Sequence, residues 1–421
     1  MNIAIIGSGG REHAICEYIN KSNKLKKIFC IPGNAGTEDI AINIEIDIND
    51  FEKIRNFIIS NNVNLLIIGP EKPLVDGLVD YLQNLNIKIF GPSKKASQLE
   101  GSKIFTKEIC KKYNIPTAEF GVYKNLNEAK KFLENNKYPI VIKADGLAAG
   151  KGVYICEDEI SAVKAIKEVF DGKFGTTDKV LVEEFISGEE MSYFIITDGK
   201  SVKKFGTAQD HKRVFENDKG KNTGGMGSYS PSRLINESLD KKILDKIVYP
   251  TLKALEDLDI SYEGFLYTGL MIKDNEPYLI EYNVRMGDPE CQTILPKLKT
   301  DLLEIIVSCT DKKLKHQQID WYDDKSISIV LCSKGYPDKI NKDIIIDNLE
   351  LLELDSKNLC FHAGTKIIED KVKSTGGRVL NFVSVATDFK KARDKVLKNL
   401  RILNWQNGHY RKDIGYKVID N

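Results

Sequence analysis

The first hundred residues alternate between short apolar segments and amphipathic segments, and this pattern limits the possible folds more than any other feature of the chain. Strand-like segments such as NIAIIG, KIFCIPG, NLLIIGP and IKIFGP are separated by helix-like segments such as GREHAICEYINKS and FEKIRNFIISNN. Buried strands that alternate with helices are typical of parallel sheets covered on both faces. We therefore expect an α/β protein with an N-terminal doubly wound parallel sheet.

The chain of 421 residues is too long for a single core, so several domains are expected. We place a first domain at residues 1–100, a central domain at 101–325 and a C-terminal α+β domain at 326–421. Within the central domain, residues 116–185 form a smaller unit around the segments YPIVIKA and KVLVEEF. The segment EGSKIFTKEICKKYNIPT predicts a helix that is capped at Ser102 and stops before the following proline.

Charge and cysteine content exclude several classes of function. The 62 basic and 61 acidic residues leave a net charge of +1, which provides no overall field for nucleic acid or a membrane surface. None of the 8 cysteines forms a Cys-x-x-Cys pair, so zinc and dithiol chemistry are not expected. The first residues lack a signal-peptide pattern, and no apolar run approaches the ~20 residues of a membrane helix. We expect a cytoplasmic protein that acts on small molecules, with no nucleic-acid or membrane partner.

The segment GSGGRE, Gly7–Glu12, follows a strand and opens a helix. Backbone N–H groups at such a turn bind anions, so a phosphate group is expected here. A dinucleotide site is disfavoured, because Glu12 stands where the third glycine of that motif belongs and the second strand ends without an acidic residue. A simple tight turn is the alternative. The candidate phosphate-binding residues are Gly9, Gly10, Arg11 and Glu12.

The segment KADGLAAGKGV, Lys143–Val153, has the glycines and lysines of a loop that covers phosphates. It is not a P-loop, because its glycine spacing is too short and a strand-like segment follows it. A flexible hairpin without a ligand is the alternative. We expect the unit at residues 116–185 to be a lid that closes over a nucleotide, because glycines give this hairpin high backbone freedom. The candidate nucleotide-binding residues are Lys143, Gly146, Gly150, Lys151 and Gly152.

One further segment combines acidic residues with a glycine. In VLVEEFISGEEMSYF, the backbone near Glu184 and Phe185 is suited to pair with an adenine ring, and Glu190 with ribose hydroxyls. A hairpin with a solvated acidic face is the alternative interpretation.

The segments AQDHKR and NTGGMGSYSP are polar and glycine-rich, which suits loops of an active site. Asp210 is expected to meet an ammonium group. His211 is a lone histidine and therefore more often structural than catalytic. Glycines allow the backbone to approach a substrate closely. The candidate substrate-binding residues are Asp210, Lys212, Asn222, Thr223, Gly224, Gly225 and Met226.

The segment PYLIEYNVRMGDPE carries a set of polar residues with period two. If it is a strand throughout, Glu281, Asn283 and Arg285 share one face. A carboxylate and an amide oxygen are ligands that Mg²⁺ prefers, and an arginine can hold a carboxylate or phosphate with two hydrogen bonds. We expect a metal–nucleotide site with a substrate clamp that continues to Gly287. An exposed polar strand face is the alternative.

Together these motifs resemble the phosphoribosylamine–glycine ligase family of ATP-grasp ligases, from GSGGREHA to YRKDIGY. The most specific motifs are KADGLAAGKGV, QDHKR followed by NTGGMGSYSP, and EYNVRMGDPE, with support from FHAGT and TGGRVL. The resemblance implies a Rossmann-like N-terminal domain, a central ATP-grasp domain with a small lid, and a C-terminal α+β domain. It also implies a monomer or weak homodimer.

The resemblance implies an enzyme that joins glycine to 5-phospho-β-D-ribosylamine. The implied reaction consumes ATP and passes through a glycyl phosphate. It implies Mg²⁺ or Mn²⁺ at Glu281 and Asn283. It also adds two residues to the nucleotide site, Lys103 and Glu183. The catalytic residues that it implies are Lys143, Asp210 and Arg285.

Three other functions remain open from the residues. The first is another ATP-grasp ligase of purine metabolism, such as one that uses formate or bicarbonate. The second is a nucleotide-dependent oxidoreductase built on GSGG. The third is a nucleotide-binding module without catalysis, which would not need Glu281, Asn283 and Arg285 together.

Overall fold

The computed structural model describes residues 1–147, 152–175 and 177–419. The N-terminal part contains a five-stranded parallel sheet in the order β3-β2-β1-β4-β5. Ala4 and Ile6 on β1 belong to one apolar core cluster, whereas Ile3 and Ile5 belong to another, so both faces of the sheet are covered. The predicted doubly wound sheet is confirmed. Its elements are β1 (Asn2–Gly7), α1 (Gly10–Asn20), β2 (Lys27–Pro32), β3 (Ile42–Asn43), α2 (Phe51–Ser60), β4 (Leu65–Ile68), α3 (Glu71–Asp76), α4 (Leu78–Leu82) and β5 (Lys88–Phe90).

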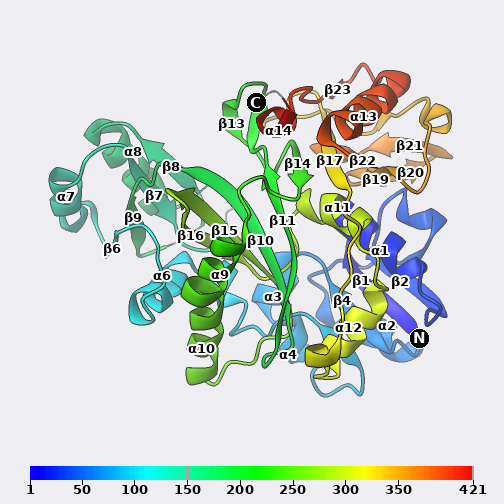
Figure 1. Ribbon diagram of the computed structural model, residues 1–421, viewed down its shortest axis with the longest axis horizontal. Helices are drawn as coiled ribbons and strands as arrows, with labels where there is room; N and C mark the ends of the chain where they lie inside the picture. Colours follow the sequence, from blue (N-terminus) through cyan, green and yellow to red (C-terminus); the bar gives the residue numbers. More distant parts are fainter. Residues whose placement is uncertain (148–151, 176, 420–421) are drawn as a thin grey trace.

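A helix and a small separate sheet follow. The Oγ atom of Ser102 accepts a hydrogen bond from the N–H of Phe105 at 3.1 Å, so this helix has the predicted cap. The next unit is a four-stranded sheet in the order β6-β9-β7-β8, which projects from the rest of the molecule at the left of Figure 1. The glycine-rich segment joins its neighbouring strands β7 and β8, as predicted, but Gly150 and Lys151 lie outside the described residues. The elements are α5 (Gln98–Gly101), α6 (Lys103–Lys112), β6 (Phe120–Tyr123), α7 (Leu126–Asn135), β7 (Ile140–Ala144), β8 (Val153–Cys156), α8 (Glu159–Phe170) and β9 (Val180–Glu184).

A nine-stranded sheet connects the middle of the chain with its C-terminal part. Its main path runs β16-β15-β10-β11-β14-β17-β22-β19, and β23 pairs with β17. β14 and β17 join the two parts, with Tyr229 opposite Ile327. β9 and β10 lie in different sheets, so interpreting VLVEEFISGEEMSYF as a hairpin is wrong. The strands are β10 (Glu189–Thr197), β11 (Val202–Asp210), β14 (Gly227–Ser230), β15 (Gly264–Lys273), β16 (Glu276–Asn283), β17 (Lys325–Ser333), β19 (Asn358–His362), β22 (Arg378–Ala386) and β23 (Gly408–His409).

Helices cover this sheet. On the longest of them, Ala392, Val396, Leu400 and Leu403 recur every three or four residues and are buried in the core formed with β17 and β22. Among the helices that the structure describes, none has the length and apolar character required to cross a membrane. The remaining elements are β12 (Arg213–Phe215), β13 (Lys219–Asn222), α9 (Glu237–Ile243), α10 (Tyr249–Asp257), α11 (Glu290–Ile294), α12 (Leu302–Thr310), β18 (Ile344–Ile345), β20 (Thr365–Ile368), β21 (Lys371–Ser374), α13 (Phe389–Leu403) and α14 (Tyr416–Ile419).

Candidate active site

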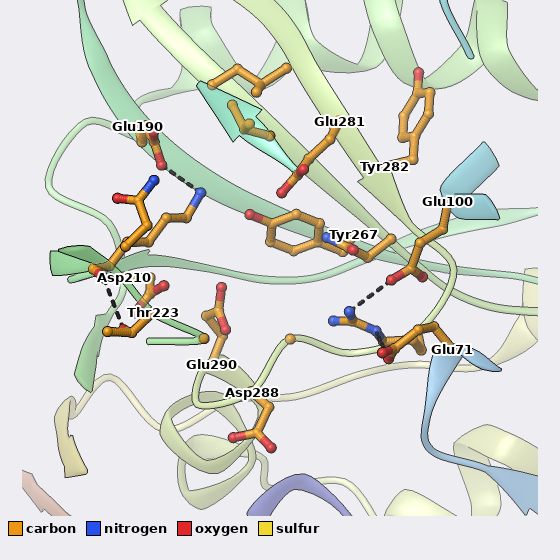
Figure 2. Close-up of a pocket in the computed structure, with 18 of the residues that line it drawn as sticks. Glu71, Glu100, Glu190, Asp210, Thr223, Tyr267, Glu281, Tyr282, Asp288 and Glu290 are labelled. Atoms are coloured by element: carbon orange, nitrogen blue, oxygen red, sulfur yellow. Dashed lines mark hydrogen bonds and ion pairs between the residues drawn. The ribbon is translucent and has the colours of Figure 1, made fainter. Parts of the chain in front are cut away.

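A single large cavity, with a volume of about 1010 Å³, gathers most of the residues predicted from the motifs. The N-terminal sheet, the small four-stranded unit and the nine-stranded sheet all contribute to its wall, part of which is drawn in Figure 2. The predicted residues that line it are Gly9, Arg11, Glu12, Lys103, Lys143, Gly146, Gly152, Glu183, Phe185, Glu190, Asp210, Lys212, Asn222, Thr223, Gly224, Glu281, Asn283, Arg285 and Gly287.

Four predicted residues do not line this cavity. Gly10 packs against the side chains of Asn381 and Gln292, and Met226 is fully buried in the C-terminal core. Gly225 backs Asp210, because a Cβ atom there would lie 2.9 Å from the Asp210 Oδ1. The Oε1 of Glu184 accepts a hydrogen bond from the N–H of Glu119 at 3.1 Å.

Buried lysines face the cavity around one carboxylate. The Nζ of Lys143 lies 2.9 Å from the Oε2 of Glu183, and the Nζ of Lys107 lies 3.3 Å from its Oε1. Lys103 donates a hydrogen bond to the carbonyl oxygen of Gly146 at 2.8 Å. Burial lowers the pKa of Lys103 and of Lys107, and the charge of Lys143 acts in the same direction on both. This lysine cluster (Lys103, Lys107 and Lys143) favours a ligand with several negative charges.

Glu281 and Asn283 present oxygens from the end of β16. Gly269 pairs with Glu281 and Leu270 with Leu279, so Ile280 is an extra residue that forms a bulge. Within the described residues, no group of three His, Cys, Asp or Glu side chains forms a complete metal site, and the Glu281 carboxylate lies near the charges of Lys103 and Lys212. Mg²⁺ fits this set, because it takes few protein oxygens and completes its coordination with phosphates and water.

The expectation that Arg285 shares a strand face with these ligands is wrong. β16 ends at Asn283, and Arg285 follows in a bend. Its Nη2 donates a hydrogen bond to Glu100 at 2.7 Å, and its Nε lies 3.3 Å from Glu71. Arg285 lowers the pKa of Glu71 to about 2, whereas burial raises the pKa of Glu100 to about 7. The arginine is therefore held at the cavity wall by two acids that come from the N-terminal hundred residues.

The start of α1 is occupied by the side chain of Glu12. Its Oε2 accepts the N–H of Gly9 at 2.7 Å, and its Oε1 accepts the Nε–H of Arg11 at 2.6 Å. Arg11 also donates to the carbonyl oxygen of Met286 at 3.1 Å. The expected free N–H group and free arginine for a phosphate are thus both engaged, because this short turn places Glu12 three residues after the N-cap. Ser8 and Gly9 remain on the cavity wall.

The loop after β11 brings Asp210 and Lys212 to the wall. The Nζ of Lys212 lies 2.7 Å from the Oε2 of Glu190, which lowers the pKa of that carboxyl. His211 is buried, and its Nε2 accepts the N–H of Gly415 at 3.3 Å. Burial and the charge of Arg411 lower the pKa of His211 to about 4, so the ring is neutral and its structural role is favoured.

The cavity wall also includes Glu290, Arg378 and Tyr267, which motif spacing did not predict as site residues. Glu290 lies in the quoted motif EYNVRMGDPE, and Arg378 in TGGRVL, so both had a signal in the sequence. Arg378 donates hydrogen bonds to the carbonyl oxygens of Gly224 and Asp288. Tyr267 lies in the middle of β15, where nothing local distinguishes it from a core residue.

Three models of phosphoribosylglycinamide synthetase match successive stretches of the chain. The N domain matches residues 1–100, the ATP-grasp (A) domain residues 101–291, and the C domain residues 326–417. A curated phosphoribosylamine–glycine ligase from Brucella melitensis is 40% identical over 421 residues, which cover 100% of this chain and 99% of the relative. One from Caldanaerobacter subterraneus is 42% identical over 416 residues, 98% of this chain and 99% of the relative.

Two solved structures resemble the chain to different degrees. The crystal structure of phosphoribosylamine–glycine ligase from Thermotoga maritima has a TM-score of 0.87 at 32% identity, covering 99% of this chain and 100% of that chain. The biotin carboxylase domain of the Hydrogenobacter thermophilus 2-oxoglutarate carboxylase, solved with MgADP and bicarbonate, has a TM-score of 0.72 at 18% identity and covers 95% and 89%. That second similarity shows a shared fold only. The chain belongs to the phosphoribosylglycinamide synthetase family of ATP-grasp proteins.

Proposed function

We propose that this protein joins glycine to 5-phospho-β-D-ribosylamine, with ATP converted to ADP and phosphate. The observation that carries the proposal is that one cavity unites the lysine cluster, the oxygens of Glu281 and Asn283, and the loops around Asp210 and Gly9. An ATP-dependent ligase needs these parts together, because a polyphosphate, a metal, an acid and an amine must meet at one point. A binding module does not need them.

The nucleotide lies along the lysine cluster. Lys103 and Lys143 face its phosphates, and Gly146 and Gly152 lie on the cavity wall beside them. The backbone at Phe185 pairs with the adenine ring, next to Glu183, and Glu190 serves the ribose. The N–H of Glu184 is not available for the ring, because it donates to the carbonyl oxygen of Glu119 at 2.9 Å. The buried positions of Lys143 and Glu183 support this arrangement, because charges act more strongly where water is excluded.

Glu281 and Asn283 would hold Mg²⁺ or Mn²⁺ between the protein and the ATP phosphates. A divalent ion bound there neutralises charge that develops on the phosphoryl oxygens. The Glu281 carboxylate and the Asn283 amide, which line the cavity at the end of β16, support this role.

The reaction proceeds in two transfers. A glycine carboxylate oxygen attacks the γ-phosphorus, ADP leaves, and glycyl phosphate forms. The amine of the ribosylamine then attacks the carbonyl carbon, phosphate leaves, and the nitrogen loses a proton. Lys143 and Arg285 stabilise the phosphoryl and carboxylate charges, and Glu71 and Glu100 fix the direction of the arginine.

We place the ribosylamine phosphate at Ser8 and Gly9. These two residues and Arg378 line both the large cavity and an adjoining cavity of about 420 Å³. The engagement of Arg11 by Glu12 is the reason to shift the phosphate from Arg11 toward Arg378. The adjoining cavity also presents Thr365 and Lys366 from the C-terminal part.

Phosphate release from ATP is the decisive experiment. It should require both glycine and freshly made phosphoribosylamine, and the product should contain glycine in amide linkage. ADP release driven by formate or bicarbonate instead of glycine would favour another ATP-grasp ligase. We further propose that the enzyme works in the cytoplasm on these small molecules, as a monomer or weak homodimer without nucleic acid.

A further inference from the structure

We propose that Asp210 and Glu290 together form the pocket for the ammonium group of glycine. The inference rests on the function proposed above and extends it to a residue, Glu290, and to a change in protonation. In the free protein the two carboxyl groups share one proton, and the ammonium group of glycine replaces that proton on binding.

The two carboxyl groups are fixed in the cavity wall from behind. Glu290 begins α11, is 5% exposed, and accepts a hydrogen bond from the Oγ of Ser192 at 3.0 Å. A Cβ atom on Gly287 would overlap the Glu290 carboxylate, and one on Gly225 would crowd Asp210. Glycine at both positions lets the backbone pack directly against the two acids. Figure 2 shows Asp210 and Glu290 on the wall of the same pocket, near Tyr267.

Asp210 lacks a partner of its own. Its Oδ1 is buried and accepts no hydrogen bond from the part of the chain that the structure describes. The nearby cations are directed elsewhere, since Lys212 pairs with Glu190 at 2.7 Å and Arg378 lies 3.4 Å from Asp288. A buried carboxyl oxygen without a donor is costly, so the site favours an external group that donates hydrogen bonds.

The neighbouring charges favour one proton on the pair. Burial and Glu290 raise the pKa of Asp210 well above its ordinary value, with Glu190 in the same sense and Lys212 and Arg378 against it. Burial also raises the pKa of Glu290, against the Ser192 hydrogen bond and the charges of Lys212 and Arg285. Two neighbouring acids whose charges oppose each other's ionisation titrate as a pair.

An ammonium group donates three hydrogen bonds, so it can satisfy the unpartnered Oδ1 of Asp210 and the carboxylate of Glu290 together. The oxygens suited to a metal, those of Glu281 and Asn283, come from a different strand, β16.

The exchange balances in atoms and charge. One carboxylic acid, one carboxylate and the glycine zwitterion give two carboxylates, one bound ammonium and one proton released to the buffer. No covalent bond changes. Binding of glycine should therefore weaken as the pH falls, whereas binding of the nucleotide should not share this dependence.

The first experiment measures KM with Glu290→Gln and Asp210→Asn. Each variant loses a charged hydrogen-bond partner of the ammonium group, so the KM for glycine should rise about 10- to 100-fold while the KM for ATP stays within about twofold. Glu256→Gln, an exposed change on α10, is the matched control. Glu290→Asp should recover part of the affinity. An unchanged glycine KM in both amide variants would overturn the inference.

The second experiment counts protons, which a purely structural role would not affect. Calorimetric titration of the wild-type enzyme with glycine, beside Mg²⁺ and a non-hydrolysable ATP analogue, is compared in phosphate and Tris buffers. Up to about one proton should be released at neutral pH, and none by Glu290→Gln. Absence of proton release in the wild type, or loss of a Mn²⁺ site in Glu290→Gln, would overturn it. If the wild-type enzyme fails to respond to glycine at all, the proposed function itself is wrong.

Discussion

The carboxylate of Glu183 lies between two buried lysines, with its Oε2 2.9 Å from Lys143 and its Oε1 3.3 Å from Lys107. The three side chains come from β9, β7 and α6, so this contact joins the small four-stranded unit to the helix that precedes it. In the absence of a nucleotide, the glutamate partly balances charges that would otherwise repel each other in a buried site. The phosphates of a bound nucleotide would then balance the lysine charges in place of Glu183.

Glu183→Gln should destabilise the free enzyme more than the nucleotide complex. The change leaves the Lys143 and Lys107 charges without a carboxylate, at a cost of about 3 kcal/mol for a buried pair. Phosphates of a bound nucleotide should restore part of this loss. The measurement is the Tm with and without Mg-ADP, with the exposed Glu157→Gln in the same four-stranded unit as the control. Equal Tm losses in both states would contradict the assignment.

Glu281→Gln should nearly abolish turnover and leave the fold intact. An amide cannot replace the charge of a carboxylate toward Mg²⁺, and a loss of at least about 100-fold in kcat is expected, equal to about 3 kcal/mol. Steady-state phosphate release and circular dichroism provide the test. Glu276→Gln, at the other end of β16 where the carboxylate pairs with Lys242 and Lys246, is the control. Near-normal activity of Glu281→Gln at ordinary Mg²⁺ would remove this residue from the metal site.

Glu100→Gln should change how stability depends on pH. Burial raises the pKa of Glu100 to about 7, above its ordinary value of 4.5. A carboxyl group with a raised pKa in the folded state stabilises the protein fully below its unfolded pKa, and this contribution is lost as the pH rises through about 7. The variant has no ionisable group at this position. The difference between its Tm and that of the wild type should therefore shift in favour of the variant as the pH rises from 5 to 8.

Thermal unfolding of both proteins across this range is the measurement, with the exposed Glu52→Gln as a control. A Tm difference between Glu100→Gln and the wild type that stays constant or shrinks with pH would show that Glu100 ionises normally beside Arg285.

Gly225→Ala should raise the KM for glycine and lower stability. Gly225 has φ +109°, and a Cβ atom there would lie 2.5 Å from Pro289 and 2.9 Å from the Asp210 Oδ1. The backbone strain alone costs about 1–3 kcal/mol. Gly175→Ala, at φ +103° with open space around the added atom, isolates that strain from the displacement of Asp210. If both variants keep the same KM for glycine, Gly225 does not position the acid.

The parts of the structure that depend on residues close together in the chain could be predicted from the sequence. The buried strands of the N-terminal sheet, the Ser102 cap and the pairing of β7 with β8 are fixed by neighbours in the chain, so periodicity and capping residues predict them. Lys143, Glu281 and Asp210 reach one cavity for the same reason, because each lies in a short motif at the end of a strand.

Features that depend on contacts between residues far apart in the chain could not be predicted from the sequence. Period two predicted one face for Glu281, Asn283 and Arg285, but the bulge at Ile280 and the end of β16 depend on the partner strand. The acids that hold Arg285 come from residues about two hundred positions earlier, at Glu71 and Glu100, where no motif marks them. The split of β9 and β10 between two sheets likewise depends on which edges are free.

The continuous nine-stranded sheet limits how the two parts of the chain can be exchanged by recombination. The family models treat the C-terminal part as a unit of its own, yet β14 and β17 are hydrogen-bonded across that boundary. Recombination that exchanged the C-terminal part alone would have to supply a strand matching β14, or leave two open sheet edges prone to aggregation. Because the loop Asn222–Met226 leads directly into β14, any mismatch at the joint would also move the substrate loop. The two parts are therefore expected to evolve as a pair and to be transferred together.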